Sequence, residues 1–237
     1  MTAFQTLVIN VEERSSRRDL MASRLLDKGI RGDFLKACEP KDLQDRQKRF
    51  LTDTAESVWQ SHLLCLKRAS IFTHPTLILE DDAIINFQKI EIDYWVQQME
   101  AHGLDFIQIG YLKINLAESI DIMIRNCYSF FTRQAFAANF FELFGFKEVG
   151  RARNQEWRKL LPKDFIVNDV RYGAHCYLVS PKFANEILVL NSPAFLPADD
   201  FYVSLAHAKS FKMIRLRKSR STQDGSPSSF TNRFLLS

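Results

Sequence analysis

Apolar and polar positions at the start of the chain follow one another in the order strand, loop, helix. Residues 6–11 form a short β-branched run, which is typical of a buried parallel strand. A polar stretch over 12–18 follows, and Met21 and Leu25 then lie four positions apart, as on one face of a helix. Gly29 stands where a helix commonly ends. The pattern predicts the first half of a β–α–β unit, whose loop lies at the carboxyl end of its strand, where open α/β sheets bind ligands.

The same patterns recur along the rest of the chain. Apolar runs and helical spacings predict strands over 76–79, 105–110 and 172–180 and helices over 55–69 and 92–102. Pro181 follows the last of these strands at the first turn of another helix, where its missing N–H costs nothing. We therefore expect an α/β fold with a mixed, mostly parallel central sheet flanked by helices.

Regularity is weakest in the middle of the chain and at its end. The segment 115–169 mixes aromatic and basic stretches, and we interpret it as helices and a variable surface insertion. We expect one main domain over 1–205, which contains this insertion, and a basic C-terminal appendage over 206–237. No internal repeat is found.

Composition and charge narrow the class of protein. With 46% hydrophobic residues and only 8 Gly among 237, the chain can bury a full core and does not have the composition of a disordered protein. The net charge is +4, and most basic residues are spread along the chain, whereas a nucleic-acid binder usually concentrates them on one face. We expect no nucleic-acid partner.

One stretch, from Lys209 to Arg220, is an exception, with six basic residues in twelve. It predicts either a strand with one solvated face or a peripheral contact with an anionic membrane leaflet. The start of the chain shows no signal peptide, and the apolar runs are shorter than a membrane span. Four cysteines without a CxxC pair argue against a structural zinc site. We expect a cytoplasmic protein and leave contact with the inner membrane surface open.

Three acidic residues in a row, Glu80-Asp81-Asp82, end the predicted strand over 76–79. Adjacent carboxylates repel one another, and a divalent cation such as Mn²⁺ or Mg²⁺, which prefers oxygen ligands, would neutralise them. Alternation along an extended strand would place Glu80 and Asp82 on one side and Asp81 on the other. We predict Asp82 as the direct metal ligand, with Glu80 supporting it. The alternative is a strand end whose acids are simply solvated.

Several of these segments resemble glycosyltransferase family 25, which includes lipooligosaccharide and procollagen galactosyltransferases. The residues from Val8 to Arg18 resemble the family's opening signature, INL…R…R, and Ser61-His62 resembles its SH helix. The residues 77–83 are similar to its LILEDD motif, 172–180 to its G-x-x-x-Y-L-I-S strand, and 196–201 to its P-x-D segment. The order is the family's order, and the resemblance spans about residues 6–205. Two features depart from the family: Ser57-Val58 stands where a Gly-Cys pair is common, and the central segment has no clear counterpart.

The resemblance implies a GT-A type nucleotide-sugar-binding fold and makes 1–205 the catalytic domain. It implies an inverting transfer of a hexose from a UDP-sugar, with galactose favoured and glucose possible, assisted by Mn²⁺ or Mg²⁺. The acceptor would be a hydroxyl of a glycan, a lipooligosaccharide or another lipid-linked or protein-linked sugar. Two other classes stay open: a module of the same fold that binds nucleotide sugars without transferring them, and a nucleic-acid binder that uses the basic tail.

The resemblance also assigns roles to residues. Inversion needs a base for the acceptor hydroxyl, and Asp199 and Asp200 are the candidates; the alternative is that Asp199 only caps a helix that begins near Phe201. Seven residues are candidates for binding the UDP-sugar: Asn10, Arg14, Arg18, His62, Glu80, Asp81 and Gly173. For Arg17 and Arg18 a solvated helix start is an equal alternative, for His62 a buried structural histidine, and Tyr177 is expected in the core.

Overall fold

Seven strands form a continuous path of hydrogen-bonded neighbours through the protein, in the order β2-β1-β3-β7-β5-β8-β6. The structure is a computed structural model, and it describes residues 3–12, 14–43, 51–112, 156–190, 194, 196–208 and 211–224. The strands of the path are β1 (Gln5–Asn10), β2 (Asp33–Lys36), β3 (Thr76–Glu80), β5 (Phe106–Gly110), β6 (Phe165–Val167), β7 (Cys176–Val179) and β8 (Met213–Leu216). Two short strands, β4 (Ala83–Ile85) and β9 (Ser221–Gln223), pair with each other, and β9 also pairs with β5.

Most of the strands on this path run in one direction. β1 is parallel to both β2 and β3, and β5 is parallel to β8. β7 lies antiparallel between β3 and β5, and β6 lies antiparallel to β8 at the edge. The predicted mixed, mostly parallel sheet is confirmed. Because β1 and β3 are parallel neighbours, their carboxyl ends meet at one edge of the sheet, with Ile9 opposite Glu80.

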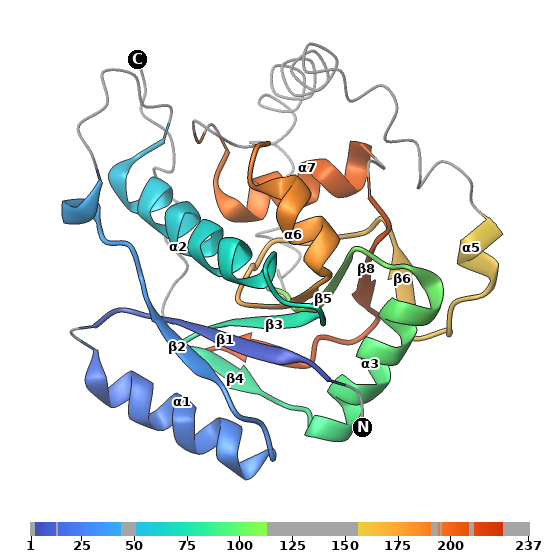
Figure 1. Cartoon of the computed structure of the whole chain (residues 1–237), viewed down its shortest axis with the longest axis horizontal. Coiled ribbons are helices and arrows are strands. Elements are labelled where there is room, and N and C mark those ends of the chain that lie inside the picture. Colours follow the sequence, from blue (N-terminus) through green and yellow to red (C-terminus); the bar gives the residue numbers. More distant parts are fainter. Residues whose placement is uncertain are drawn as a thin grey trace, which may run out of the picture.

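Helices cover both faces of the sheet (Figure 1). One face packs against α2 (Asp53–Ala69), α6 (Pro181–Ile187) and α7 (Ala198–Ala208), whose apolar side chains form one core cluster. The other face packs against α1 (Ser15–Asp27) and α3 (Lys89–His102), in a second core cluster that also includes Trp157 of the short α5 (Glu156–Lys159). The 3₁₀ turn η1 (Pro40–Asp42) lies between β2 and α2.

The strands read as continuous apolar runs because both of their faces are covered. Leu7 and Ile78 point into the cluster under α2, while their neighbours Val8 and Leu79 point into the cluster under α1 and α3. The predicted helix boundaries follow from local chemistry: Gly29 adopts φ 70° just after Lys28, which caps the end of α1, and Pro181 opens α6. The structure confirms both positions.

The C-terminal part of the chain belongs to the sheet. β8 lies between β5 and β6, and α7 continues to Ala208, across the predicted boundary at 205. The apolar residues of the basic stretch, such as Met213 and Ile214, are in the core, and Arg215 pairs with Asp169. The prediction of an appendage over 206–237 is therefore wrong for 211–224. The many basic residues suggested an exposed segment, but the segment contains a buried strand whose Arg215 has an acidic partner.

The predicted insertion over 115–169 is described from residue 156 onward. This part contributes α5 and the edge strand β6, so at least its end is integrated in the fold. The segment 113–155 and the tail from 225 lie outside the described residues.

Candidate active site

The acidic run lies at the end of β3, next to the end of β1. The backbone N–H of Asp81 donates to the carbonyl of Ile9 at 3.0 Å, so the turn that follows β3 is fixed to β1. From β1, the amide Nδ2 of Asn10 donates to Oδ2 of Asp81 at 2.7 Å. Asn10 and Asp81 are both buried, and they form one hydrogen-bonded unit at the predicted ligand-binding edge.

Of the arginines at the start of α1, Arg17 is the one whose side chain reaches Asp81 and Asp82. Its Nη1 lies 3.5 Å from Oδ1 of Asp81 and 3.9 Å from Oδ2 of Asp82. Arg18 is exposed and lies instead over the ring of Phe34, at 5.3 Å from the centroid, and Arg14 is exposed at the start of α1. The sequence alone does not show which of these arginines contacts the acidic run. The direction of α1 brings Arg17 to Asp81 and Asp82.

Asp81 and Asp82 occupy a turn, so the alternation of an extended strand ends at Glu80. Asp81 and Asp82 share Arg17, while Glu80 is directed to other partners. The alternation that placed Glu80 and Asp82 on one side therefore does not extend to Asp82, because the period of two holds only while the backbone stays extended. The predicted pairing of Glu80 with Asp82 around a cation stays a prediction.

Asp82 carries an unsatisfied oxygen. Its Oδ1 is buried and has no hydrogen-bond partner, although the side chain as a whole is 17% exposed. Burial, together with the negative charges of Glu80 and Asp81, raises the pKa of Asp82 to about 6. A buried acceptor without a donor, crowded by two other acids, has the chemistry of a ligand for a hard cation.

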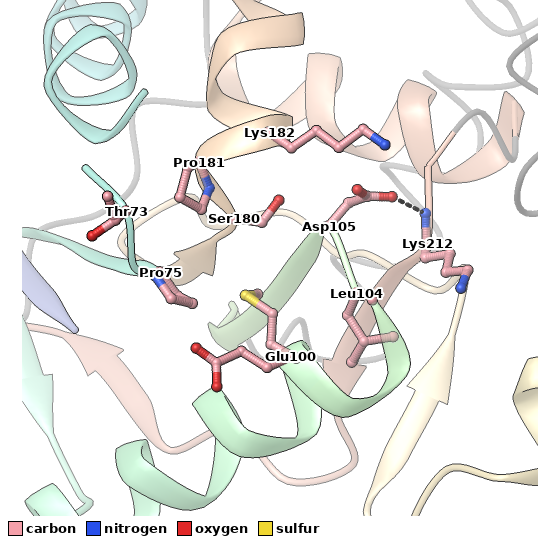
Figure 2. Close-up of a pocket in the computed structure, with 11 residues that line it drawn as sticks. Thr73, Pro75, Glu100, Leu104, Asp105, Ser180, Pro181, Lys182 and Lys212 are labelled. Atoms are coloured by element: carbon pink, nitrogen blue, oxygen red, sulfur yellow. Dashed lines mark hydrogen bonds between the residues drawn. The ribbon is translucent and has the colours of Figure 1, made fainter. Parts of the chain in front are cut away.

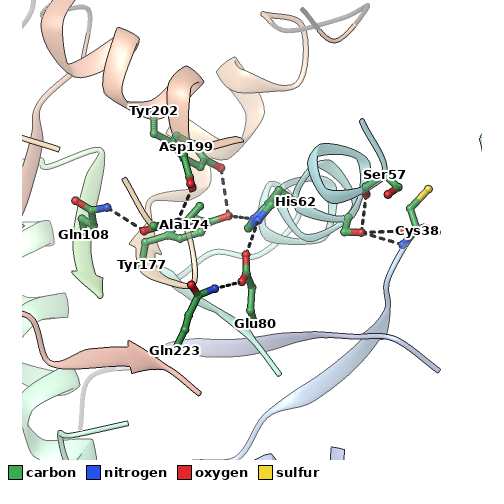
Figure 3. A network of polar contacts seen from close by, with 12 residues as sticks. Cys38, Ser57, His62, Glu80, Gln108, Ala174, Tyr177, Asp199, Tyr202 and Gln223 are labelled. Atoms are coloured by element: carbon green, nitrogen blue, oxygen red, sulfur yellow. Dashed lines mark hydrogen bonds and ion pairs between the residues drawn. The ribbon is translucent and has the colours of Figure 1, made fainter. Parts of the chain in front are cut away.

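Glu80 is held by two side chains from distant parts of the chain. Its Oε1 lies 3.3 Å from Nε2 of His62, and its Oε2 accepts from Nε2 of Gln223 at 2.9 Å (Figure 3). Burial acts to raise the pKa of Glu80, but its interactions with His62, His175 and Gln223 outweigh burial, and the pKa is lowered. Glu80 is therefore ionised and oriented, with 23% of its side chain exposed.

His62 lies behind Glu80, on α2, and is fully buried. Its Nδ1 lies 2.7 Å from the hydroxyl of Tyr177, and this hydroxyl also accepts from that of Tyr202 at 3.2 Å. Both ring nitrogens thus face protein groups, so in this arrangement His62 would act on a ligand through Glu80.

Ser61, the neighbour of His62 in the SH motif, has a structural contact. Its hydroxyl donates to the carbonyl of Ser57 at 2.8 Å and accepts from the backbone N–H of Cys38 at 2.8 Å. The second bond fastens α2 to the segment that follows β2. In this motif Ser61 therefore fixes the position of α2, and His62 contacts Glu80.

A loop over 171–175 precedes β7 and is shaped by Gly173. This glycine has φ 108°, and a Cβ there would lie 3.0 Å from the backbone nitrogen of Leu112. Gln108 of β5 holds the loop: its Nε2 donates to the carbonyls of Arg171 at 2.6 Å and Gly173 at 3.0 Å, and its Oε1 accepts from the N–H of Arg171 at 2.8 Å. The conformation and close contacts of Gly173 give it a backbone role; its predicted contact with the sugar stays a prediction.

The same loop joins the acidic run to the predicted base. The N–H of Ala174 donates to Oδ1 of Asp199 at 2.8 Å, and the carbonyl of His175 accepts from the N–H of Glu80 at 3.0 Å. Asp199 and Asp200 lie in the first turn of α7, which begins at Ala198, so Asp199 is not the residue that precedes the helix. The structure thus brings both sets of predicted acids to one end of the sheet.

A cleft of about 370 Å³ lies at the opposite end of the strands (Figure 2). Its walls come from Pro75 before β3, Leu104 and Asp105 before β5, and Ser180 after β7. Because Glu80 stands at the other end of β3 from Pro75, this cleft is separate from the acidic run.

Two further features of the described residues concern metal ions and membranes. Among the described residues, no three His, Cys, Asp or Glu side chains are arranged to hold a metal ion by themselves. None of the helices in the same part of the chain combines the length and the apolar character that crossing a bilayer needs. Of the cysteines in the described ranges, Cys38, Cys65 and Cys176 are free thiols.

Several contributors to the site were not anticipated from the sequence. Gln223, Gln108 and Tyr202 belong to no local motif that predicts a site, and the sequence predicts Tyr177 only as a core residue. Each becomes visible through a contact between distant segments; 143 positions separate Gln223 from Glu80.

Comparison with protein families identifies the family to which this region is similar. A protein-family model described as glycosyltransferase family 25 (LPS biosynthesis protein) matches residues 3–202. The matched region contains the ends of β1 and β3, α2, the loop before β7 and the first turn of α7. No curated protein matches the chain.

Proposed function

The chain belongs to glycosyltransferase family 25, and from this membership we propose that it transfers a hexose from a UDP-sugar to an acceptor hydroxyl with the help of a divalent cation. The observation that supports the metal best is the buried, unpartnered Oδ1 of Asp82 beside two further carboxylates. The family's description points to lipopolysaccharide biosynthesis, so a lipooligosaccharide or other glycan is the favoured acceptor class. Galactose is the favoured sugar, and glucose is the second candidate.

In this proposal Asp82 binds Mn²⁺ or Mg²⁺ directly, and Glu80 supports it. The absence of a three-residue cage among the described side chains suits a cation that takes its other ligands from water and phosphate oxygens. When bound, the cation would neutralise the charge that develops on the departing diphosphate. Asp81, held by Asn10 and Arg17, is our candidate for the ribose side of the nucleotide.

Asp199 is the proposed general base, with Asp200 as the second candidate. The acceptor oxygen attacks the anomeric carbon, the bond from this carbon to the UDP oxygen breaks, and the hydroxyl proton passes to the carboxylate. A single displacement of this kind inverts the anomeric centre. The bond from the Ala174 N–H to Asp199 supports this choice, because it orients the carboxylate beside the loop that also contacts Glu80.

We propose a cytoplasmic location, which the free thiols favour. The earlier alternative of a membrane contact through the stretch from Lys209 to Arg220 loses its support, because the apolar side chains of its described part are buried. Several of its cations also have protein partners: Lys212 donates to the carbonyl of His102, and Arg220 to Glu91.

The proposed function is tested by UDP release from a panel of UDP-sugars with Mn²⁺. We expect release with UDP-galactose or UDP-glucose, and a loss of about 100-fold or more in Asp82→Ala, because an electrostatic contribution to the leaving group is removed. Asp19→Ala, an exposed acid on α1, is the matched control and should keep full activity. Release that persists in Asp82→Ala would remove the metal assignment, and UDP binding without release from any donor would favour the inactive module.

A further inference from the structure

We propose that His62 is a positioning residue that acts on the reaction through Glu80, and that the hydroxyls of Tyr177 and Tyr202 fix the ring tautomer this requires. The inference rests on the proposed function in one respect, namely that Glu80 supports a bound cation and nucleotide. The four residues come from different elements, α2, β3, β7 and α7, and form one unbroken chain of polar contacts (Figure 3).

The chain of contacts has a direction. The Tyr202 hydroxyl donates to the Tyr177 hydroxyl at 3.2 Å, which leaves the proton of Tyr177 for the next partner, Nδ1 of His62, at 2.7 Å. In the proposed arrangement Nδ1 is the acceptor and Nε2 carries the ring proton. Nε2 faces Oε1 of Glu80 at 3.3 Å and is the donor to it. Each hydrogen bond therefore points toward the carboxylate.

The surroundings hold this order in place. His62, Tyr177 and Tyr202 are buried, so water does not compete for their polar atoms. The ring of Phe106 lies 5.2 Å from that of Tyr177 and 5.0 Å from that of Tyr202, and the rings of Trp59 and Phe201 also pack against Tyr202. Burial raises the pKa of both tyrosines, which keeps their hydroxyl protons available for donation.

The chain of contacts from Tyr202 to Glu80, called the relay below, also connects the acidic run with the proposed base Asp199. Tyr202 lies three positions after Asp199 on α7, so the two residues share a face of that helix. At the other end, Gln223 holds the second oxygen of Glu80. The orientation of Glu80 is thus set from α2 and β9, and the position of α7 is coupled to it through the tyrosines.

Two substitutions at His62 separate the contact with Glu80 from the rest of the ring. In His62→Gln the amide nitrogen can reach the place of Nε2 and donate to Glu80, whereas in His62→Asn the amide ends near the place of Nδ1 and leaves Glu80 without this donor. We expect the Mn²⁺–UDP affinity, measured by calorimetry, to stay within about 3-fold in the Gln variant and to fall about 10- to 100-fold in the Asn variant, as for residues that orient metal ligands. Because both variants lose the same buried ring, similar melting temperatures would exclude a general loss of fold.

A second measurement reports the tautomer without metal or donor. In ¹⁵N-histidine spectra of the whole protein, the signal that disappears in His62→Gln should show a protonated Nε2 and a bare Nδ1. Tyr177→Phe removes the donor to Nδ1 and should shift that nitrogen resonance. A protonated Nδ1 in the wild type would overturn the inference, as would a wild-type Mn²⁺–UDP affinity in His62→Asn.

The outcomes separate the two proposals. If wild type and Asp82→Ala bind Mn²⁺–UDP equally, the metal assignment fails, while the tautomer spectrum still decides the relay. If Asp82→Ala loses binding and His62→Asn does not, the proposed function stands and the positioning role of His62 fails.

Discussion

The carboxyl group of Asp82 is held among groups that disfavour its charge. Burial and the neighbouring Glu80 and Asp81 raise its pKa, and the attraction of Arg17 at 3.9 Å only partly compensates. The carboxylate of Asp81 has partners in Asn10 and Arg17. That of Glu80 has partners in His62 and Gln223. Asp82 is therefore the acid of this run whose negative charge is least compensated. In the proposed function, this poorly compensated negative charge attracts the cation.

The first prediction is that Asp82→Asn stabilises the metal-free protein in a pH-dependent way. The pKa of Asp82 is raised from 3.8 to about 6 in the folded state. The folded protein therefore binds this proton more tightly than the unfolded chain, and the ionised group lowers stability above about pH 6 but not below about pH 4. We expect a gain of up to about 2–3 kcal/mol in Asp82→Asn at pH 8, which vanishes at pH 4.

Thermal unfolding in EDTA over this pH range measures the effect as the difference between variant and wild type. The same comparison with Mn²⁺ and UDP should reverse the order, because ligand binding stabilises only the form with an intact site. A gain of equal size at pH 4 and pH 8 would show that the charge of Asp82 is not its cause.

The second prediction concerns Gly173, whose replacement by Ala should destabilise the fold and the site together. At φ 108° a side chain is strained, and its Cβ would meet the Leu112 nitrogen at 3.0 Å and the His175 ring at 3.1 Å. We expect a loss of about 1–3 kcal/mol in urea unfolding and a clear loss of transfer activity. Gly29→Ala is the matched control: its φ is also positive, at 70°, but the nearest atom to a Cβ is 3.9 Å away. It should cost less stability and leave activity intact.

Gln108 shows how one strand positions a loop that carries no regular structure. Its side-chain amide makes three hydrogen bonds to the backbone of Arg171 and Gly173, and this backbone leads directly into Ala174, which donates to Asp199. A buried glutamine on a strand is normally unfavourable, but here it replaces the ladder partners that the loop lacks.

The third prediction is that Gln108→Met impairs the acceptor step more than nucleotide binding. The substitution leaves the N–H of Arg171 and two carbonyls without partners, which costs about 1–3 kcal/mol, and it loosens the loop that orients Asp199. Within the described residues, the side-chain contacts of Asp82 and Glu80 do not involve Gln108. We therefore expect Mn²⁺–UDP affinity within about 2-fold of wild type and a fall in kcat of about 10-fold or more.

Titration of UDP with Mn²⁺ and steady-state kinetics with varied acceptor provide the two readouts. Gln97→Met, an exposed glutamine on α3, should change neither. Equal losses of nucleotide affinity and turnover would assign Gln108 to the stability of the sheet rather than to the loop.

Local patterns predicted the parts of the molecule that depend on neighbours in sequence. The strand ending in Glu80, the helix ending at Gly29 and the helix opening at Pro181 are set by short-range chemistry, and the structure has them where the patterns indicate. The partners of the acidic run were not predictable in this way, since Gln223 and His62 meet Glu80 only after the chain has folded. The alternation of side chains along β3 also does not extend to Asp82, because Asp81 and Asp82 lie in a turn.

Charge patterning gives a wrong prediction for the segment over 211–224. Six basic residues in twelve suggested a surface segment, yet β8 is an internal strand of the sheet. β9 then places Gln223 against Glu80, so this part of the chain is needed both for the sheet and for the site. The family match ends at residue 202, before these strands, although the fold continues through them.

The last prediction therefore tests whether β8 is part of the cooperative unit. Ile214 is fully buried on β8 and belongs to the core cluster under α1 and α3. Truncation of a buried isoleucine to alanine leaves a cavity and removes apolar contacts, so Ile214→Ala should lower the free energy of unfolding by about 2–5 kcal/mol. Ile90→Ala, which removes a side chain that is 75% exposed, should change it by less than about 0.5 kcal/mol.

Urea unfolding, followed by both tryptophan fluorescence and far-UV circular dichroism, distinguishes an internal strand β8 from a separate appendage. An internal strand predicts that Ile214→Ala shifts one shared transition, because Trp59 and Trp95 lie in the clusters that flank the same sheet. An appendage predicts that the main transition stays in place and that a separate, weaker one moves. Since Gln223 depends on β9 for its position, a destabilised β8–β9 segment should also weaken Mn²⁺–UDP binding at urea concentrations below the main transition.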